Sequence, residues 1–180
     1  MSTYPVMPPR PLEAGDLAPD FDLASTEDVV LMLKDEVPRT PVVLYVFSGP
    51  QDEQARADLA ELERRRRTLT ELRSKILAVS PAPLAELKKL QSDLRLRFPL
   101  LADDRGFTKG YGLEPDAGGK SAPPALYLIG SDCRVMWRER PVISLSSALG
   151  SVEKQLAGQA SSAAGYPRKV INRWVDRWVH

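Results

Sequence analysis

The chain has 180 residues, 43% of them apolar, and its 25 Lys and Arg residues nearly balance its 24 Asp and Glu residues, for a formal net charge of +1. This length favours one domain with a sizeable core, and the charge balance excludes a whole-molecule field that recruits nucleic acid or an anionic membrane. The one cysteine, Cys133, and the one histidine, His180, exclude an intramolecular disulfide, a Ser-His-Asp triad and most zinc sites. We therefore predict no metal and no cofactor.

The first residues of the chain, 1–14, are rich in proline and predict an extended arm. They lack a cationic segment followed by an apolar one, and no later stretch approaches the roughly 18 apolar residues of a membrane-spanning helix. We expect a soluble, cytoplasmic protein without a transmembrane segment.

After the arm, the sequence alternates between strand and helix patterns. The run PVVLYVF at 41–47 is typical of a strand buried on both faces. Residues 52–74 place Ala55, Leu59 and Leu62 on one apolar stripe of a helix. Similar patterns predict further strands at 20–23, 29–33, 76–79, 98–101, 125–129 and 135–138, and further helices at 84–94, 103–111 and 145–157.

The last two predicted strands form a hairpin through the tight turn from Gly130 to Cys133. The small residues at 158–165 predict a linker, which leads to a final segment at 167–179. This order of elements predicts an α/β sandwich with a mixed central β-sheet and flanking helices, of which the thioredoxin fold is the simplest form.

Five strings in the chain resemble a known family. They are GDLAPDFDL at 15–23, PVVLYVF at 41–47, FPLLADDRG at 98–106, YGL at 111–113 and PALYLIGSDCRV at 124–135. In this order they are similar to the peroxiredoxins, the alkyl hydroperoxide reductase and thiol-specific antioxidant group, especially its bacterioferritin-comigratory branch. We therefore predict an arm at 1–14, a peroxiredoxin-like domain with a thioredoxin-like fold at 15–158, and a linker with a C-terminal amphipathic helix at 159–180.

The resemblance implies thiol-dependent hydroperoxide reduction by a cysteine in the pattern Pro-x-x-x-Thr-x-x-Cys, just after the first core strand. A helix N-terminus and a nearby arginine lower the pKa of such a thiol. If Ser48 takes the proline position of this pattern, Asp52 stands at the threonine and Ala55 at the cysteine.

A second alignment starts the same pattern at Pro50 and places Gln54 at the threonine and Ala57 at the cysteine. Neither alignment contains a thiol, since no cysteine occurs at 48–75. The arginine that the resemblance implies before the hairpin falls at Pro123. The pattern therefore predicts a degenerate peroxide site.

Pro124 stands where thioredoxin-like proteins carry a cis-proline before a core strand. The resemblance therefore predicts a cis peptide bond between Pro123 and Pro124, although only about 5% of X-Pro bonds in folded proteins are cis.

Cys133 is the one residue that could act as a relocated reactive thiol, because the neighbouring Arg134 favours a thiolate. Its place in a hairpin turn, away from a helix N-terminus, favours instead a surface or half-packed thiol. An intermolecular disulfide is a further alternative.

The run from Arg64 to Arg67 could be taken for a nucleic-acid site. Four consecutive residues of a helix point about 100° apart, and Glu61, Glu63 and Glu71 lie within ion-pairing reach. We therefore interpret the run as a solvated helix face and predict no nucleic-acid partner.

The C-terminal segment carries Trp174 and Trp178 at helical spacing, together with Val170, Ile171 and Val175, and basic residues surround them. Two tryptophans on a lone short helix leave a large apolar patch exposed. We expect this segment to dock on its own domain or across a homodimer. Binding to another protein or to a membrane surface are the alternatives.

These observations favour a peroxiredoxin-like protein that acts as a non-catalytic binding or assembly module, with a peroxiredoxin, another thiol-redox protein or a second copy as its partner. The first alternative is a residual thiol peroxidase or redox-responsive protein that acts through Cys133. The second is a small polar ligand in the former active-site pocket, beside Asp52, Glu53 and Gln54.

Overall fold

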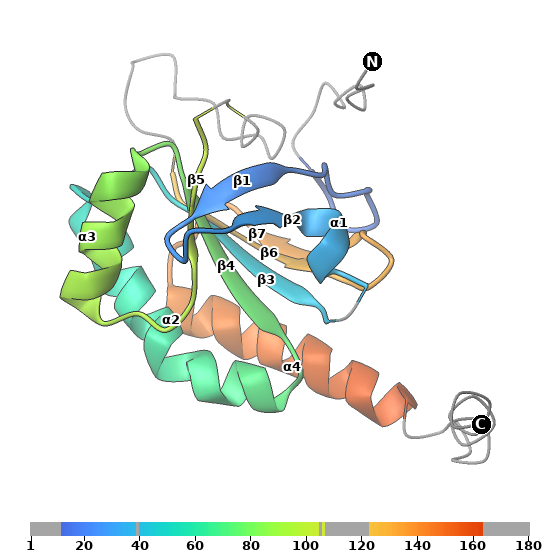
Figure 1. Cartoon of the computed structure of the whole chain (residues 1–180). Helices are drawn as coiled ribbons and strands as arrows, with labels where there is room; N and C mark the ends of the chain where they lie inside the picture. The colour runs from blue at the N-terminus through green and yellow to red at the C-terminus, as the bar shows by residue number, and fades with distance from the viewer. Residues whose placement is uncertain (1–11, 39, 105, 107–122, 164–180) are drawn as a thin grey trace, which may run out of the picture.

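The computed structural model describes residues 12–38, 40–104, 106 and 123–163 (Figure 1). In chain order, its elements are β1 (Asp22–Ser25), β2 (Val30–Met32), α1 (Leu33–Glu36), β3 (Val42–Val46), α2 (Glu53–Glu71), β4 (Lys75–Ser80), α3 (Leu84–Leu94), β5 (Leu100–Ala102), β6 (Ala125–Ile129), β7 (Val135–Glu139) and α4 (Leu145–Ala163).

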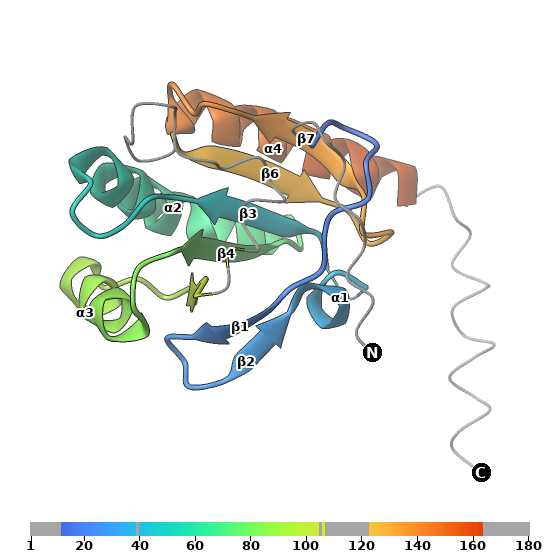
Figure 2. The same cartoon turned by 90° about the horizontal axis from the view of Figure 1, so that it is seen from above.

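The strands form one mixed sheet in the order β2-β1-β5-β4-β3-β6-β7. The central strands β3, β4 and β5 are parallel to one another, and the other pairs are antiparallel. Helices α2, α3 and α4 lie along one face of this sheet (Figures 1 and 2). The predicted α/β sandwich with a mixed sheet is confirmed.

Two apolar cores explain why β3 is a continuous apolar run. Alternate residues of the strand, such as Val43 and Tyr45, pack into a core with α2, α3 and α4. Its other residues, such as Leu44, pack on the opposite face with Leu33 of α1 and with the N-terminal residue Leu12. All five residues of β3 are buried, so both faces of the strand select apolar side chains.

The hairpin between β6 and β7 has the predicted turn. The backbone N–H of Cys133 donates to the carbonyl oxygen of Gly130 at 3.0 Å, and the N–H of Gly130 donates to the carbonyl oxygen of Arg134 at 2.9 Å. Cys133 has a φ of +61°, a left-handed conformation that glycine usually provides.

Helix α4 is longer than the sequence predicts. It continues to Ala163, so the linker predicted to begin at 158 was wrong for 158–163. The segment consists largely of Gln, Ala and Ser, which a helix accepts at little cost once the preceding turns are formed. Most of the helix predicted at 103–111 lies outside the described residues.

The prediction of a cis peptide bond between Pro123 and Pro124 was wrong. Within the described part of the chain, the cis bond is that between Arg140 and Pro141. The prediction rested on family position alone, whereas an X-Pro bond favours trans by about 0.5–1 kcal/mol unless its surroundings select cis. The carbonyl oxygen of Pro124 accepts a hydrogen bond from the N–H of Val142 at 2.9 Å.

Candidate functional site

The carboxyl end of β3 brings together the positions that the family pattern selects. Val46, the last residue of β3, pairs with Ala125, the first residue of β6. Pro123 and Pro124 directly precede Ala125, so they lie at the same edge of the sheet as residues 48–52. The proline, threonine, cysteine and arginine positions of the pattern therefore converge at the start of α2.

Asp52 is the N-cap of α2, and its carboxylate is bound to the first turn of that helix. Oδ1 accepts hydrogen bonds from the backbone N–H groups of Gln54 at 2.9 Å and Ala55 at 3.3 Å. Oδ2 accepts a third hydrogen bond from Oγ of Ser48 at 3.1 Å. The carboxylate thus binds N–H groups that have no partner within the helix and lies at the positive end of the α2 dipole. This end is the place where a helix best stabilises an anion.

The cysteine position of the first alignment is Ala55, which is 1% exposed and packs in the core between α2 and the sheet. Its methyl group offers no nucleophile. In the second alignment the threonine position is Gln54, whose Nε2 donates to Oδ1 of Asp58 at 2.9 Å, and the cysteine position is the exposed Ala57. Neither set of residues contains a thiol.

Tyr45 and Asp58 form a buried polar pair beneath this site that the sequence analysis missed. Oη of Tyr45 donates to Oδ2 of Asp58 at 2.8 Å, and Asp58 is 4% exposed. Burial of the Tyr45 hydroxyl, with the neighbouring Asp58 carboxylate as the next cause, raises the pKa of Tyr45. A signal was present in the sequence, since Asp58 interrupts the apolar stripe between Ala55 and Leu62.

A groove of about 380 Å³ runs beside the start of α2. Its lining consists of Pro50, Gln51 and Arg56 on the α2 side and Glu86, Lys89, Leu90 and Asp93 of α3. One nitrogen of the Arg56 guanidinium already has a partner within the chain, because Nη1 donates to the carbonyl oxygen of Pro50 at 3.4 Å. The three residues that were expected to line a ligand pocket, Asp52, Glu53 and Gln54, are not part of this groove.

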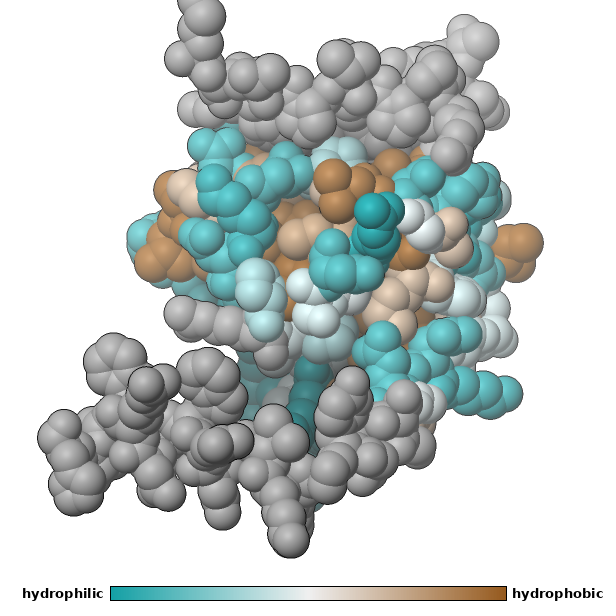
Figure 3. All heavy atoms as spheres, turned by 90° about the vertical axis from the view of Figure 1, so that its right-hand side faces the viewer, coloured by the Kyte–Doolittle hydropathy of each residue, from teal (hydrophilic) through white to brown (hydrophobic). Residues whose placement is uncertain are grey.

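Cys133 lies at the opposite end of the sheet from these residues. The register pairs Ile129, which precedes the hairpin turn, with Val42 at the start of β3, so the thiol is separated from the start of α2 by the length of the strand, roughly 13 Å. Burial raises the pKa of the Cys133 thiol, and the carboxylates of Asp20 and Asp132 raise it further. Figure 3 faces this end of the molecule, where hydrophobic and hydrophilic residues are interspersed.

Arg134 does not activate the thiol as the sequence suggested. Its Nη1 donates to the carbonyl oxygen of Gly15 at 2.8 Å. The net electrostatic effect on Cys133 comes from carboxylates and disfavours the thiolate.

The arginine run of α2 is engaged in ion pairs, as predicted. Arg64 pairs with Glu61, Arg66 with Glu63 at 3.0 Å, and Arg67 with Glu71 at 3.0 Å.

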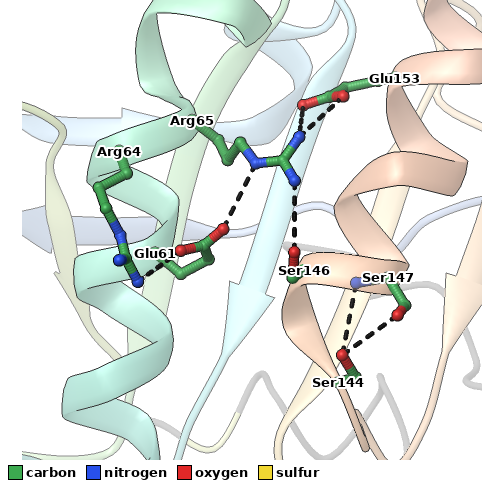
Figure 4. Close-up of polar contacts among 7 residues, drawn as sticks. All are labelled: Glu61, Arg64, Arg65, Ser144, Ser146, Ser147 and Glu153. Atoms are coloured by element: carbon green, nitrogen blue, oxygen red, sulfur yellow. Dashed lines mark hydrogen bonds and ion pairs between the residues drawn. The ribbon is translucent and has the colours of Figure 1, made fainter.

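Arg65 has a different role, because it joins α2 to α4 (Figure 4). Its Nη1 donates to both carboxylate oxygens of Glu153, at 2.9 and 3.1 Å, and its Nη2 donates to Oγ of Ser146 at 3.3 Å. Glu153 is the largest cause of the raised pKa of Arg65. The run is thus a mixture of surface ion pairs and one contact between helices.

Three further expectations concern metal binding, a membrane-spanning helix and the C-terminal tryptophans. Within the described residues, no group of three or more His, Cys, Asp and Glu side chains could hold a metal ion, and no helix is long and apolar enough to cross a membrane. Trp174 and Trp178, the predicted docking residues, lie outside the described residues.

Comparison with known proteins identifies the family and the fold of the chain. The model of the AhpC/TSA family matches residues 14–138. No curated protein matches the chain.

Solved structures with the same fold include peroxiredoxins from three bacteria. Peroxidoxin BcpB from Mycobacterium tuberculosis is 19% identical, with a TM-score of 0.75, and the match covers 82% of this chain and 97% of that one. A Cys-to-Ser variant of PrxQ from Xylella fastidiosa is 17% identical, with a TM-score of 0.74, and the match covers 84% of this chain and 99% of that one. The bacterioferritin comigratory protein of Xanthomonas campestris is 16% identical, with a TM-score of 0.69, and the match covers 78% of this chain and 92% of that one.

Proposed function

Because the chain belongs to the AhpC/TSA family, we propose that it is a peroxiredoxin-like protein whose peroxide-reducing centre has been replaced and that it acts as a non-catalytic binding or assembly module. Its partner is a peroxiredoxin, another thiol-redox protein or a second copy of the chain. The fold of this family can persist without the chemistry, because function resides in the site and not in the fold.

The observation that carries the proposal is the position of the Asp52 carboxylate. A reactive cysteine needs a site that favours its thiolate, and a helix N-terminus is such a site. Here the N–H groups of Gln54 and Ala55 already bind Oδ1 of Asp52. A carboxylate in this place opposes the formation of a second anion beside it, and the chain has alanine at the aligned cysteine position.

The alternative of a thiol peroxidase acting through Cys133 has less support. Reactive cysteines have lowered pKa values, whereas burial and two nearby carboxylates raise the pKa of Cys133. The second alternative, a polar ligand beside Asp52 and Gln54, is disfavoured because both side chains already bind groups of their own chain.

Peroxide reactivity separates these functions. The reduced protein and its Cys133→Ser variant are exposed to hydrogen peroxide and to an organic hydroperoxide, and peroxide consumption and intact mass are followed. We expect equal, background consumption by both proteins and no rapid gain of one oxygen at Cys133. Fast formation of a sulfenic acid or a disulfide dimer, lost in Cys133→Ser, would instead establish the enzyme function.

Assembly is tested separately by analytical ultracentrifugation. The full-length chain is measured alone and with a catalytic peroxiredoxin from the same organism, under reducing conditions. The proposal predicts a homodimer or a mixed complex whose mass does not depend on Cys133. A monomer that binds neither a second copy nor the peroxiredoxin contradicts the assembly role.

A further inference from the structure

A second hollow lies where α2 ends and where β4 and β5 begin. Its volume is about 580 Å³, and it is lined by Glu27, Thr40, Arg66, Thr70, Arg73, Ser74, Lys75, Ile76, Arg97, Phe98 and Pro99. Helix α2 has 19 residues and therefore places this hollow roughly 28 Å from Asp52 at its other end. The hollow is independent of the candidate site.

The lining is strongly cationic in a chain whose charges nearly cancel. It contains one carboxylate, that of Glu27, and four basic side chains, those of Arg66, Arg73, Lys75 and Arg97. Such a concentration of one charge in a concave surface attracts a ligand of the opposite sign.

Two of the four cations are already paired. Nε of Arg66 lies 3.0 Å from Oε1 of Glu63, and Nζ of Lys75 lies 2.7 Å from Oε2 of Glu36. The other two are exposed, and their side chains make no hydrogen bond or ion pair with another described residue. These are Arg73, which follows the C-cap residue Leu72 of α2, and Arg97, directly before Phe98. Among the described residues, none competes with a ligand for these two guanidinium groups.

The backbone carbonyl groups at the end of α2 contribute little competing negative charge, although those of a helix C-terminus are normally unpaired. The carboxylate of Glu63 also lies here, but Nε of Arg66 and the backbone N–H of Arg97 already bind it. The hydroxyl of Ser74 donates to the carbonyl oxygen of Leu69 at 2.8 Å, and that of Thr70 donates to the carbonyl oxygen of Arg66 at 2.9 Å. The N–H of Arg73 donates to the carbonyl oxygen of Thr70 at 2.9 Å. N–H and O–H donors of the chain itself thus bind carbonyl oxygens near the end of the helix.

We propose that this hollow binds a small, multiply charged oxyanion, of phosphate or carboxylate chemistry, between Arg73 and Arg97. Guanidinium groups present planar pairs of N–H donors that match such oxygens. The buried Ile76 and Phe98 form an apolar wall beside the charged groups, as in many small-molecule sites.

The test uses inorganic pyrophosphate and citrate as probes, with isothermal titration calorimetry and the thermal midpoint of the full chain as readouts. Binding of at least one probe, weakened by added salt, is expected. Arg73→Gln and Arg97→Gln should each weaken it by about tenfold or more, since each removes charge-assisted hydrogen bonds. Pyrophosphate binding without citrate binding identifies phosphate as the preferred group, and the reverse identifies carboxylate.

The matched control is Arg67→Gln, which removes the same charge from α2 outside the hollow, at a side chain that is 88% exposed. This variant should bind the probe like the unmodified chain. Equal loss in Arg67→Gln, unchanged binding in both Arg73→Gln and Arg97→Gln, or no binding of either probe at millimolar concentration overturns the proposal. Thermal midpoints without probe verify that each variant is folded.

Discussion

The hydroxyl of Tyr45 in β3 donates to the buried carboxylate of Asp58 in α2, with 2.8 Å between Oη and Oδ2. Gln54 donates to the other oxygen of the same carboxylate. A carboxylate in an apolar core is costly unless such donors compensate for its lost hydration. The pair therefore fixes the rotation of α2 about its axis, and with it the place where Asp52 meets the end of β3.

Replacing Tyr45 with phenylalanine should lower the free energy of unfolding by about 1–3 kcal/mol, because Asp58 remains buried with one donor fewer. Denaturant unfolding of Tyr45→Phe, Asp58→Asn and the double variant measures this. Since both substitutions act on the same hydrogen bond, the double variant should lose less stability than the sum of the two. Additivity within about 0.3–0.5 kcal/mol contradicts a direct coupling.

The same tyrosine predicts a loss of stability at alkaline pH. Burial, and then Asp58, raises the pKa of Tyr45 above its ordinary value of 10.0, so the folded state holds the phenolic proton more tightly than the unfolded state. This contribution is fully present below the unfolded pKa and is lost as the pH rises through the folded pKa.

Urea unfolding from about pH 9 to about pH 11, on either side of the ordinary tyrosine pKa, measures this loss. The decline in stability should be shallower in Tyr45→Phe than in the unmodified chain. Part of the decline should persist in the variant, because burial also raises the pKa of Tyr127. Identical slopes in the two proteins refute a role for Tyr45.

Local sequence patterns predicted the strands and helices well where burial on both faces leaves a continuous signal. The run at 41–47 predicted β3 within one residue at each end, and the acidic residues near Arg64 to Arg67 predicted their ion pairs. Composition alone misplaced the end of α4, since small polar residues occur in both linkers and helices.

The site was predictable only in part. The family pattern selected Ser48, Asp52 and Ala55 as site positions, and the sheet register places them at the same end of the sheet as Pro123. The pair of Tyr45 and Asp58 was not foreseen, because the two residues lie on different elements and their contact depends on how α2 packs against the sheet. Likewise, Arg134 was expected to act on Cys133, but the fold directs its guanidinium to Gly15.

The cap of α2 should contribute measurably to stability. Asp52→Ala removes the acceptor for the N–H groups of Gln54 and Ala55 and should cost about 0.5–2 kcal/mol of unfolding free energy. Asp52→Asn and Asp52→Ser retain a side-chain oxygen and should cost much less. Denaturant midpoints of the three variants distinguish the capping hydrogen bonds from a general effect of charge. Asp52→Asn and Asp52→Ala both remove the negative charge, so equal losses in these two variants would contradict a role of the cap.

A thiol restored at the start of α2 should reveal how Asp52 alters this site. In a Cys133→Ser background, Ala55→Cys places the only thiol of the chain beside the Asp52 carboxylate, and adding Asp52→Thr removes that charge while keeping a neutral cap oxygen. We expect a lower thiol pKa in the variant with threonine, because the helix N-terminus then stabilises the thiolate in place of the carboxylate.

The pH dependence of alkylation by iodoacetamide gives both thiol pKa values, and peroxide consumption shows whether the lower one restores chemistry. The matched control is Ala57→Cys in the same two backgrounds, since this exposed position also lies in the first turns of α2 but its backbone N–H does not bind the carboxylate of Asp52. Its thiol should respond less to Asp52→Thr. Equal thiol pKa values for Cys at position 55 with and without Asp52→Thr would show that the carboxylate does not govern this site, which contradicts its proposed replacement of a thiolate.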